Sequence, residues 1–282
     1  MDVAVPLNGI ANKVFHLVGA NDTLIIDQLI GEKMDKVHPV ATTREGFIAD
    51  RVGSGMDTHQ TWVRTGENGE VEAALYTARF NKNIMTEADF CGNAEKILTG
   101  APCKVKGDEK PSFIFYSISS FKRGAGEGLI GAVRGAMEES SPDMTASTLS
   151  PLRVAGGKPA EDRNFTDWLK TEITGDVNDI RSDTERLKGY ALQYLSENRH
   201  LVQKFHMGNG AYIGDVNVNA NVKESADYTD GMNVMMNYVY PGEAMRQELQ
   251  ESYQSGQMVM APHLVDQANR AQNRTVFKPF IS

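Results

Sequence analysis

The spacing of apolar residues along the chain predicts short strands and helices that follow one another without a repeat. Val71–Phe80 alternates apolar and polar positions, as a half-buried strand does, and a GENG turn joins it to a strand predicted at Thr61–Thr65. The aromatic and β-branched run Ser112–Ser119 predicts a further strand. Directly after it, a glycine-rich turn leads into apolar residues at helical spacing, so a strand–turn–helix unit is expected there.

The remaining segments continue this mixture of elements. Strands are predicted over residues 145–149, 202–207 and 211–218, the last two joined by a tight turn. Helices are predicted over residues 23–32, 41–52, 86–98, 164–172, 183–198, 228–238, 242–255 and 261–271. Strands and helices mixed in this way indicate an α+β or an open α/β domain.

Composition narrows the class of protein but not its chemistry. The 282 residues are enough for one large domain or two small ones. A formal net charge of −8 argues against a nucleic-acid-binding protein, which needs a basic face for phosphates. The chain has no run of about 18 apolar residues and does not start like a secretory signal. We therefore expect a cytoplasmic protein without a membrane span.

The glycine-rich turn is the first segment that suggests chemistry. Arg123, Gly124, Gly126 and Gly128 form the pattern R-x-x-G-x-G at the start of the predicted helix. Backbone amides at a helix N-terminus can bind a pyrophosphate where no side chain shields them, and the helix dipole favours the anion. The alternative interpretation of this segment is a flexible turn. A dinucleotide-binding site is not indicated, because the glycines are out of register with the pattern of such sites.

Ser150 and His206 are the two other candidates. Ser150 lies at the end of a predicted strand and precedes a proline, where its hydroxyl would point out of the sheet edge. His206 stands between large apolar residues just before a tight turn. A serine in such a place is usually a turn residue and such a histidine a core residue, although imidazole can act as an acid or base. The other histidines lack metal-ligand spacing, so no metal is expected.

Taken together and in order, seven sequence blocks resemble the catalytic domain of malonyl-CoA decarboxylase, which has the GNAT acyltransferase fold. The resemblance runs over residues 37–240, so residues 1–36 are an N-terminal segment of unknown role and residues 37–282 the expected catalytic domain. It implies an α+β fold with a GNAT-like central mixed sheet flanked by helices. The blocks are VHPV, IFYSIS, the glycine-rich loop, STLSP, FTDWL, KFHMGNGA and MMNYVY.

The resemblance also implies roles for single residues. The family's catalytic serine matches Ser150, and its catalytic histidine matches His206. With this pair the protein would be a carboxy-lyase that converts malonyl-CoA to acetyl-CoA without a cofactor. The family's loop for the CoA pyrophosphate matches Gly126 to Ala132. Asn209 and Tyr240 are either supporting polar groups or a turn asparagine and a core tyrosine. The predicted substrate-binding residues are Arg123, Gly124, Gly126, Glu127, Gly128, Leu129, Ile130, Gly131, Ala132, Asn209 and Tyr240.

The chain departs from the family pattern in several places. The helical domain that precedes the family's catalytic domain has no match, and the segment between Ser150 and His206 is shorter than in the family. Leu129 replaces the family's glutamate, and Lys122-Arg123 replaces a polar pair before the loop. Malonyl groups on an acyl carrier protein and substituted malonyl groups are therefore alternative substrates. A GNAT acyltransferase and a non-catalytic acyl-CoA-binding domain are alternative functions, and a homo-oligomer is a candidate assembly.

Overall fold

Ten segments of the chain are described by a computed structural model. They are residues 14–30, 43–52, 59–80, 112–140, 145–148, 150–152, 164–198, 201–220, 231–272 and 277–279. By its internal contacts the chain divides into two units. The first contains residues 1–83, 96–104 and 108–146, and the second contains residues 84–95, 105–107 and 147–282.

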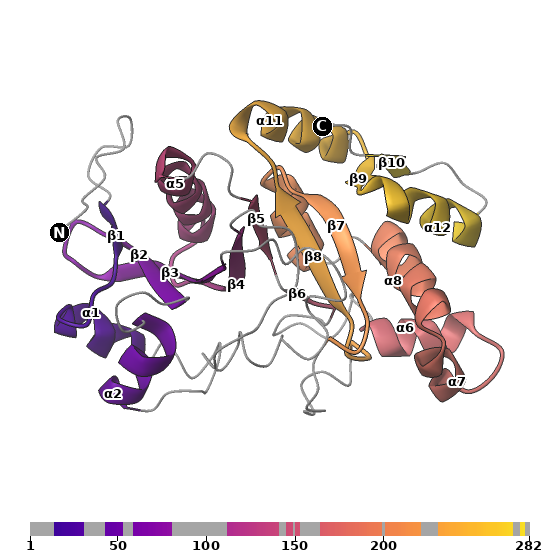
Figure 1. Ribbon diagram of the computed structural model, residues 1–282, viewed down its shortest axis with the longest axis horizontal. Helices are drawn as coiled ribbons and strands as arrows, with labels where there is room; N and C mark the ends of the chain where they lie inside the picture. The colour runs from indigo at the N-terminus through magenta and orange to yellow at the C-terminus, as the bar shows by residue number, and fades with distance from the viewer. Residues whose placement is uncertain are drawn as a thin grey trace. The chain divides into compact units, whose positions relative to one another are not determined.

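An antiparallel sheet forms the centre of the first unit (Figure 1). Its strands lie in the order β1, β2, β3, β4 and comprise Val14–Leu17, His59–Thr65, Val71–Phe80 and Ser112–Ser120. The predicted hairpin between β2 and β3 is confirmed, and Gly69 in its turn has a φ of 77°, a conformation that favours glycine. Strand β3 was predicted to be half-buried, but its side chains from Val71 to Ala78 are all buried, because the sheet is covered on both faces.

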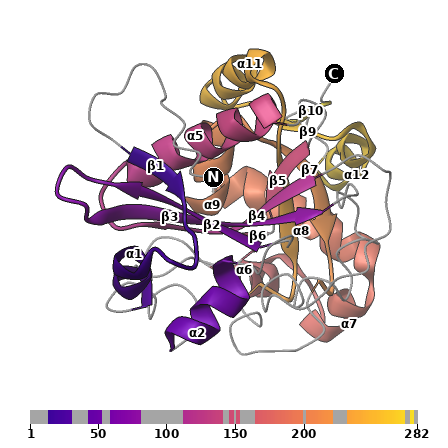
Figure 2. The same cartoon turned by 60° about the vertical axis from the view of Figure 1, so that its left-hand side comes forward.

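Helices cover the two faces of this sheet (Figure 2). Helix α5 (Ala125–Ser140) lies on one face, and α1 (Thr23–Gln28) and α2 (Arg44–Phe47) lie on the other. The side chain of Thr43 accepts the amide of Gly46 at 3.1 Å and so caps α2, which lies within the helix predicted over 41–52. A π-helical turn, η3 (Ile48–Val52), continues the chain from α2.

The second unit contains a mixed sheet. Its strands are β5 (Thr145–Thr148, which begins at the end of the first unit), β6 (Ser150–Pro151), β7 (Tyr212–Asn217), β8 (Met235–Tyr240), β9 (Met258–Met260) and β10 (Phe277–Pro279). The order is β5, β8, β7, β9, β10, and β6 pairs with β8. Strand β7 is antiparallel to β8 and parallel to β9, which is parallel to β10.

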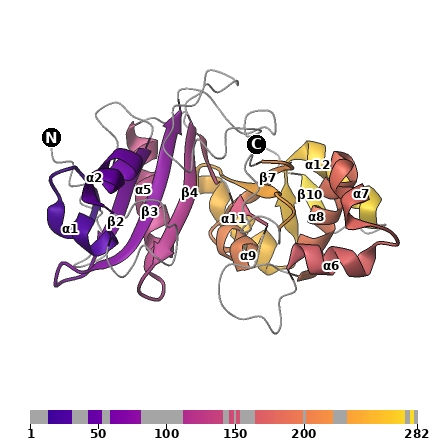
Figure 3. The same cartoon turned by 90° about the horizontal axis from the view of Figure 1, so that it is seen from below.

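Six helices of the second unit are described. They are α6 (Phe165–Glu172), α7 (Val177–Ser182), α8 (Thr184–Asn198), α9 (Leu201–Gly208), α11 (Glu243–Gln254) and α12 (Pro262–Gln272). Figure 3 shows α9 and α11 on one side of β7, and α6, α8 and α12 on the other. Phe165 and Trp168 of α6 pack against Tyr194 of α8 with ring centroids 5.4 Å away, so aromatic contacts hold these two helices together.

Two predicted elements are wrong. The strand predicted over 202–207 is helix α9, whose buried residues Gln203, His206 and Met207 follow helical spacing. The helix predicted over 228–238 is also wrong, because residues 231–234 are not helical and residues 235–238 belong to strand β8, whose six residues are all buried. An apolar run buried on both faces has no alternation that distinguishes a strand from a helix.

Some predictions concern residues outside the described ranges. The predicted helix over 86–98 lies there, and so does the boundary at residues 36 and 37, which stays a prediction. Strands β1, β9 and β10 and helix α7 were not predicted, because each is short. No helix among the described segments is long and apolar enough to cross a lipid bilayer.

Candidate active site

Ser150 lies directly after β5, at the strand end where the sequence predicts it. It opens the short strand β6, which pairs with Met236 of β8, and only 6% of the residue is exposed. The Ser150 hydroxyl donates to Thr148 Oγ1 at 3.1 Å. Thr148 Oγ1 also accepts the backbone amide of Tyr238 at 3.1 Å. Thr148 therefore fixes the serine side chain relative to β8.

His206 projects from α9 toward the same strand. Its Nε2 lies 3.2 Å from Ser150 Oγ, and its Nδ1 lies 2.7 Å from the hydroxyl of Tyr240. The imidazole stacks on the ring of Tyr238, with centroids 4.8 Å apart and an interplanar angle of 22°. Tyr238 and Tyr240 are two residues apart on β8, so both side chains emerge on the face that α9 covers. The structure thus brings together three predicted site residues, Ser150, His206 and Tyr240.

The turn after α9 fixes the position of the helix that carries His206. Asn209 donates its side-chain Nδ2 to the carbonyl of Phe205 at 2.7 Å, which satisfies a carbonyl at the helix end. Gly210 has a φ of 81°, and a Cβ at this position would lie 2.8 Å from the carbonyl oxygen of Arg246 in α11. Glycine therefore permits both the turn and the close approach of α11. This geometry fits the interpretation of Asn209 as a turn residue, and a contact with substrate stays a prediction.

Burial decides the charge of His206. It lowers the pKa of the imidazole from its ordinary 6.5 to about 3, so the ring is neutral at pH 7. A neutral imidazole carries one N–H. Because the hydroxyl hydrogen of Ser150 goes to Thr148, Ser150 Oγ can accept the Nε2–H, and Tyr240 then donates to Nδ1. The arrangement forms one hydrogen-bonded chain from Tyr240 through His206 and Ser150 to Thr148.

The glycine-rich loop lies in the first unit. Gly124 has a φ of 75°, and α5 begins at the next residue. The Gly126 amide donates to Ser120 Oγ at 3.3 Å. Lys122 forms an ion pair with Glu72, which lowers the pKa of the Glu72 carboxyl and raises the pKa of the Lys122 ammonium group. The charge of Lys122 thus has a carboxylate partner, whereas Arg123 is exposed on the loop.

The predicted loop residues differ in what they can offer a ligand. Only the first helical turn has amides without intrahelical acceptors, and it comprises the residues up to Gly128. The residues Leu129 to Ala132 belong to the second turn, and the side chains of Leu129 and Ile130 are buried. We expect a phosphate to meet the first turn, and the binding role of every loop residue stays a prediction.

Two contributors to the site were missed from the sequence. Thr148 could have been found, because it stands two residues before Ser150 on the same strand. The sequence does not indicate Tyr238, because the predicted helix over 228–238 ends before Tyr240, and only a strand puts the two tyrosines on one face. Within the described segments, no group of three or more His, Cys, Asp or Glu side chains could hold a metal ion.

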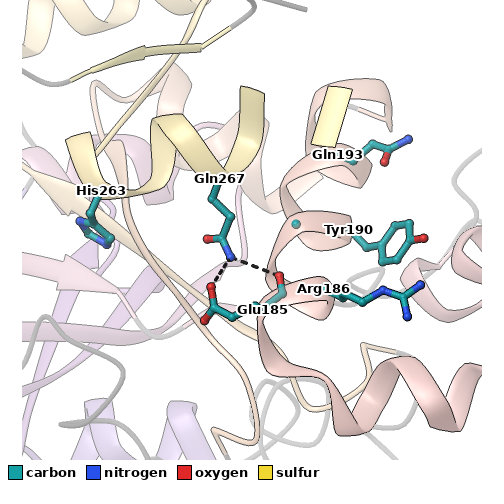
Figure 4. Close-up of a pocket in the computed structure, with 7 residues that line it drawn as sticks. Glu185, Arg186, Tyr190, Gln193, His263 and Gln267 are labelled. Carbon is teal, nitrogen blue, oxygen red and sulfur yellow. Dashed lines mark hydrogen bonds between the residues drawn. The ribbon is translucent and has the colours of Figure 1, made fainter. Parts of the chain in front are cut away.

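A pocket of about 520 Å³ lies between α8 and α12, and none of the predicted site residues lines it (Figure 4). Gln267 crosses it and donates to the backbone carbonyl and the carboxylate of Glu185, at 3.2 and 2.9 Å. Figure 4 shows the side chains of Arg186, Tyr190 and Gln193 pointing away from Gln267 and His263. These side chains do not converge on one point, so the pocket indicates no particular ligand.

Comparison with known proteins supports the fold. No protein-family model and no curated protein matches the chain. Three solved structures titled malonyl-CoA decarboxylase match about nine tenths of it. The structure from Rhodopseudomonas palustris is 19% identical with a TM-score of 0.63, over 89% of this chain and 65% of that one. The structure from Agrobacterium vitis is 16% identical with a TM-score of 0.66, over 91% and 67%.

The third structure, from Cupriavidus metallidurans, is 17% identical with a TM-score of 0.63, over 90% of this chain and 67% of that one. The chain therefore spans about two thirds of the length of the structures it matches. The predicted α+β class with a mixed sheet flanked by helices is confirmed, and the chain has the fold of the solved malonyl-CoA decarboxylases. The GNAT-like character of the sheet stays a prediction.

Proposed function

We propose that this protein removes carbon dioxide from a malonyl thioester, with malonyl-CoA as substrate and Ser150 and His206 as the catalytic groups, without a metal or other cofactor. The observation that carries the proposal is the 3.2 Å contact between Ser150 Oγ and His206 Nε2. The chain that contains this contact has the fold of solved malonyl-CoA decarboxylases. The sequence blocks around Ser150 and His206 also resemble those of that family's catalytic serine and histidine.

The reaction needs positioning and one proton. The bond between the carboxylate carbon and the α-carbon breaks, and its electron pair moves into the thioester carbonyl to give an enolate while CO2 leaves. A proton taken up from solvent then adds to the α-carbon and completes the acetyl thioester. The protein must hold the carboxylate perpendicular to the carbonyl plane, stabilise the enolate oxygen and place the proton donor.

His206 is the proton donor in this scheme. The imidazole is neutral in the free protein, but a malonyl carboxylate beside it raises its pKa by favouring the charged form. Nε2 can then protonate the α-carbon, while the contact of Nδ1 with Tyr240 keeps the ring oriented. Ser150 binds the carboxylate and helps to relay the proton, and Thr148 holds the serine in place.

The glycine-rich loop is the part of the chain that we assign to CoA. The amides of the first turn of α5 would take the pyrophosphate, and the exposed guanidinium of Arg123 would add positive charge. The amides of Ala125 and Gly126 already have acceptors in the carbonyl of Lys122 and in Ser120 Oγ, so the two amides that follow them in the first turn are the better candidates.

The first test is conversion of malonyl-CoA to acetyl-CoA, followed by mass spectrometry. We expect turnover by the wild type and loss of turnover in Ser150→Ala and His206→Gln. Ser147→Ala is the matched control, because Ser147 is a buried serine of the same segment whose Oγ has no hydrogen-bond partner among the described residues. If both site variants turned over like Ser147→Ala, the assignment of the catalytic pair would be wrong.

The same assay separates the alternative functions. Malonyl groups on an acyl carrier protein and methylmalonyl-CoA are tested beside malonyl-CoA, and preference for either one would change the substrate but keep the reaction. Release of free CoA with an added amine, without loss of CO2, would indicate acyl transfer. Binding of acyl-CoA without any reaction would indicate a non-catalytic domain.

A further inference from the structure

The first unit buries a guanidinium that has no anionic partner among the residues that the structure describes. Arg51, on the π-helical turn η3, is only 1% exposed. Its Nε, Nη1 and Nη2 are all shielded from solvent and have no hydrogen-bond partner among the residues that the structure describes. Its contacts are with two tyrosine rings instead, since Cζ lies 5.4 Å from the centroid of Tyr76 and 5.3 Å from that of Tyr116.

The other buried arginines of the described segments each have a carboxylate. Arg64 lies 3.0 Å from Glu72, measured from Nε to Oε2, and Arg134 pairs with Glu138. A guanidinium stays charged at every physiological pH, and removing it from water is costly unless an anion and hydrogen bonds compensate. Contacts with two aromatic rings offset only part of that cost. Arg51 thus differs from Arg64 and Arg134 in lacking the group that a buried arginine needs.

The backbone around Arg51 is irregular in two places. The π-helical turn that carries it is a rare conformation that is frequent at functional sites. Strands β3 and β4 shift register beside Tyr76, so that Tyr76 pairs with Ser117, Thr77 pairs with Phe115, and Tyr116 is left as the extra residue. Such a bulge turns a side chain in a new direction, and bulges are frequent beside binding sites. Both tyrosine rings under the guanidinium are therefore placed by this bulge.

We propose that Arg51, with Tyr76 and Tyr116 beneath it, is a binding site in the first unit for the carboxylate of a small organic acid. The planar fork of a guanidinium matches two carboxylate oxygens, and the other two buried arginines of the described segments, Arg64 and Arg134, both pair with carboxylates. The three guanidinium nitrogens are shielded from solvent, so an acid reaches them only when the surrounding structure opens locally. The site does not depend on the reaction proposed for Ser150 and His206.

The test is a thermal-unfolding titration with acetate, malonate and succinate, with uncharged malonamide as the control ligand. Because the guanidinium is enclosed, binding requires local opening, and each sample is incubated until its signal is constant. We expect at least one acid to raise the unfolding temperature of the wild type and of Ser150→Ala in a saturable manner. The same acid should leave Arg51→Met unchanged, and malonamide should have no effect on any variant.

Arg64→Met is the matched variant for an internal ion pair. Arg64→Met leaves the buried carboxylate of Glu72 with only the exposed ammonium group of Lys122, so the variant should unfold roughly 5 to 10 °C below the wild type without any added acid. Arg51→Met should unfold within about 3 °C of the wild type under the same conditions, because only ring contacts are lost.

Three results would overturn the proposal. An effect of Arg51→Met as large as that of Arg64→Met would mean that the chain itself supplies the carboxylate. Equal stabilisation of the wild type and Arg51→Met by an acid would mean that the acid binds elsewhere. The absence of stabilisation by all three acids would mean that the guanidinium is held by its aromatic contacts alone. Loss of malonyl-CoA turnover bears on none of these results.

Discussion

Each unit of the chain buries a polar cluster, and the two clusters differ in how their hydrogen bonds are completed. In the second unit, Tyr240, His206, Ser150 and Thr148 form a chain of contacts of 2.7 to 3.2 Å. In the first unit, all three nitrogens of Arg51 lack a hydrogen-bond partner among the described residues, and the contacts of the guanidinium are with tyrosine rings.

The difference follows from the charge of the central group. Burial can make a histidine neutral, and a neutral ring needs only one donor and one acceptor, which Tyr240 and Ser150 supply. An arginine cannot lose its charge in this way, so neutral neighbours do not compensate for the burial of its positive charge. The hydrogen bonds of the cluster around His206 are therefore formed before any ligand binds, whereas those of Arg51 require an added anion.

The largest expected effect is on turnover when the centre of the complete cluster is changed. His206→Gln keeps a polar side chain of similar size but removes the proton donor, so we expect kcat for malonyl-CoA to fall by roughly 10²- to 10⁴-fold. Steady-state assays of acetyl-CoA formation measure this fall. His263→Gln is the control, because His263 is exposed on α12 and should keep wild-type turnover. A fall below tenfold would show that another group delivers the proton.

The second effect is a loss of stability in acid. The pKa of His206 is about 3 in the folded chain and near 6.5 when the chain unfolds, so the unfolded state binds more protons between these values. The contribution of a neutral His206 is complete above pH 6.5 and is lost as the pH falls toward 3. At pH 4.5 the loss should be roughly 2 to 3 kcal/mol.

Urea unfolding of the wild type and His206→Gln at pH 7.5 and 4.5 measures this contribution. Other groups also titrate in this range, so the relevant quantity is the difference between the two proteins in their change with pH. The wild type should lose roughly 2 to 3 kcal/mol more than the variant. Equal changes in both proteins would mean that His206 is accessible to protons in the folded state, and the contrast with Arg51 would disappear.

The sequence indicates the catalytic pair of the candidate site better than it indicates the residues that surround the pair. Ser150 and His206 were found because their blocks resemble a known family, and the structure puts them in contact. Thr148 and Tyr238 were not found, because their contributions depend on β5, β8 and α9 meeting in three dimensions. Nothing near Arg51 in sequence indicated its role either, since Tyr76 and Tyr116 approach it only through the sheet.

The fold was predictable where periodicity and turns agreed. The strand Val71–Phe80 and its glycine turn were predicted with the observed bounds, because alternation and turn chemistry point to the same hairpin. The segments now seen as α9 and β8 were misassigned. In α9 the turn at 208–210 suggested a hairpin, although Gly210 and Asn209 end a helix there. In β8 full burial removed the alternation on which the prediction depends.

A smaller effect tests whether Tyr240 orients His206. Tyr240→Phe keeps the ring but leaves Nδ1 of His206 without this hydroxyl. We expect kcat to fall about tenfold, equivalent to about 1.4 kcal/mol, with little change in KM, because the ring is no longer held in one tautomer. Nitrogen-15 NMR of the histidines should show a single tautomer with the hydrogen on Nε2 in the wild type and a mixture in the variant.

Tyr238→Phe is the matched control for this prediction. It retains the stacked ring beneath His206, so both the tautomer and the turnover should stay close to those of the wild type. An unchanged tautomer in Tyr240→Phe, together with reduced turnover, would assign Tyr240 a direct contact with substrate instead of a positioning role.

The smallest effect compares two serines within the second unit. Ser147 is as buried as Ser150, yet its Oγ has no hydrogen-bond partner among the described residues. Removing a buried hydroxyl without a partner costs nothing, so Ser147→Ala should keep full turnover and unfold at the same stability or up to about 1 kcal/mol higher. Urea unfolding and the acetyl-CoA assay measure both quantities. A loss of stability would show that Ser147 has a bound water or another hydrogen-bond partner. The buried hydrogen-bond network of the second unit would then include Ser147 as well as the residues around His206.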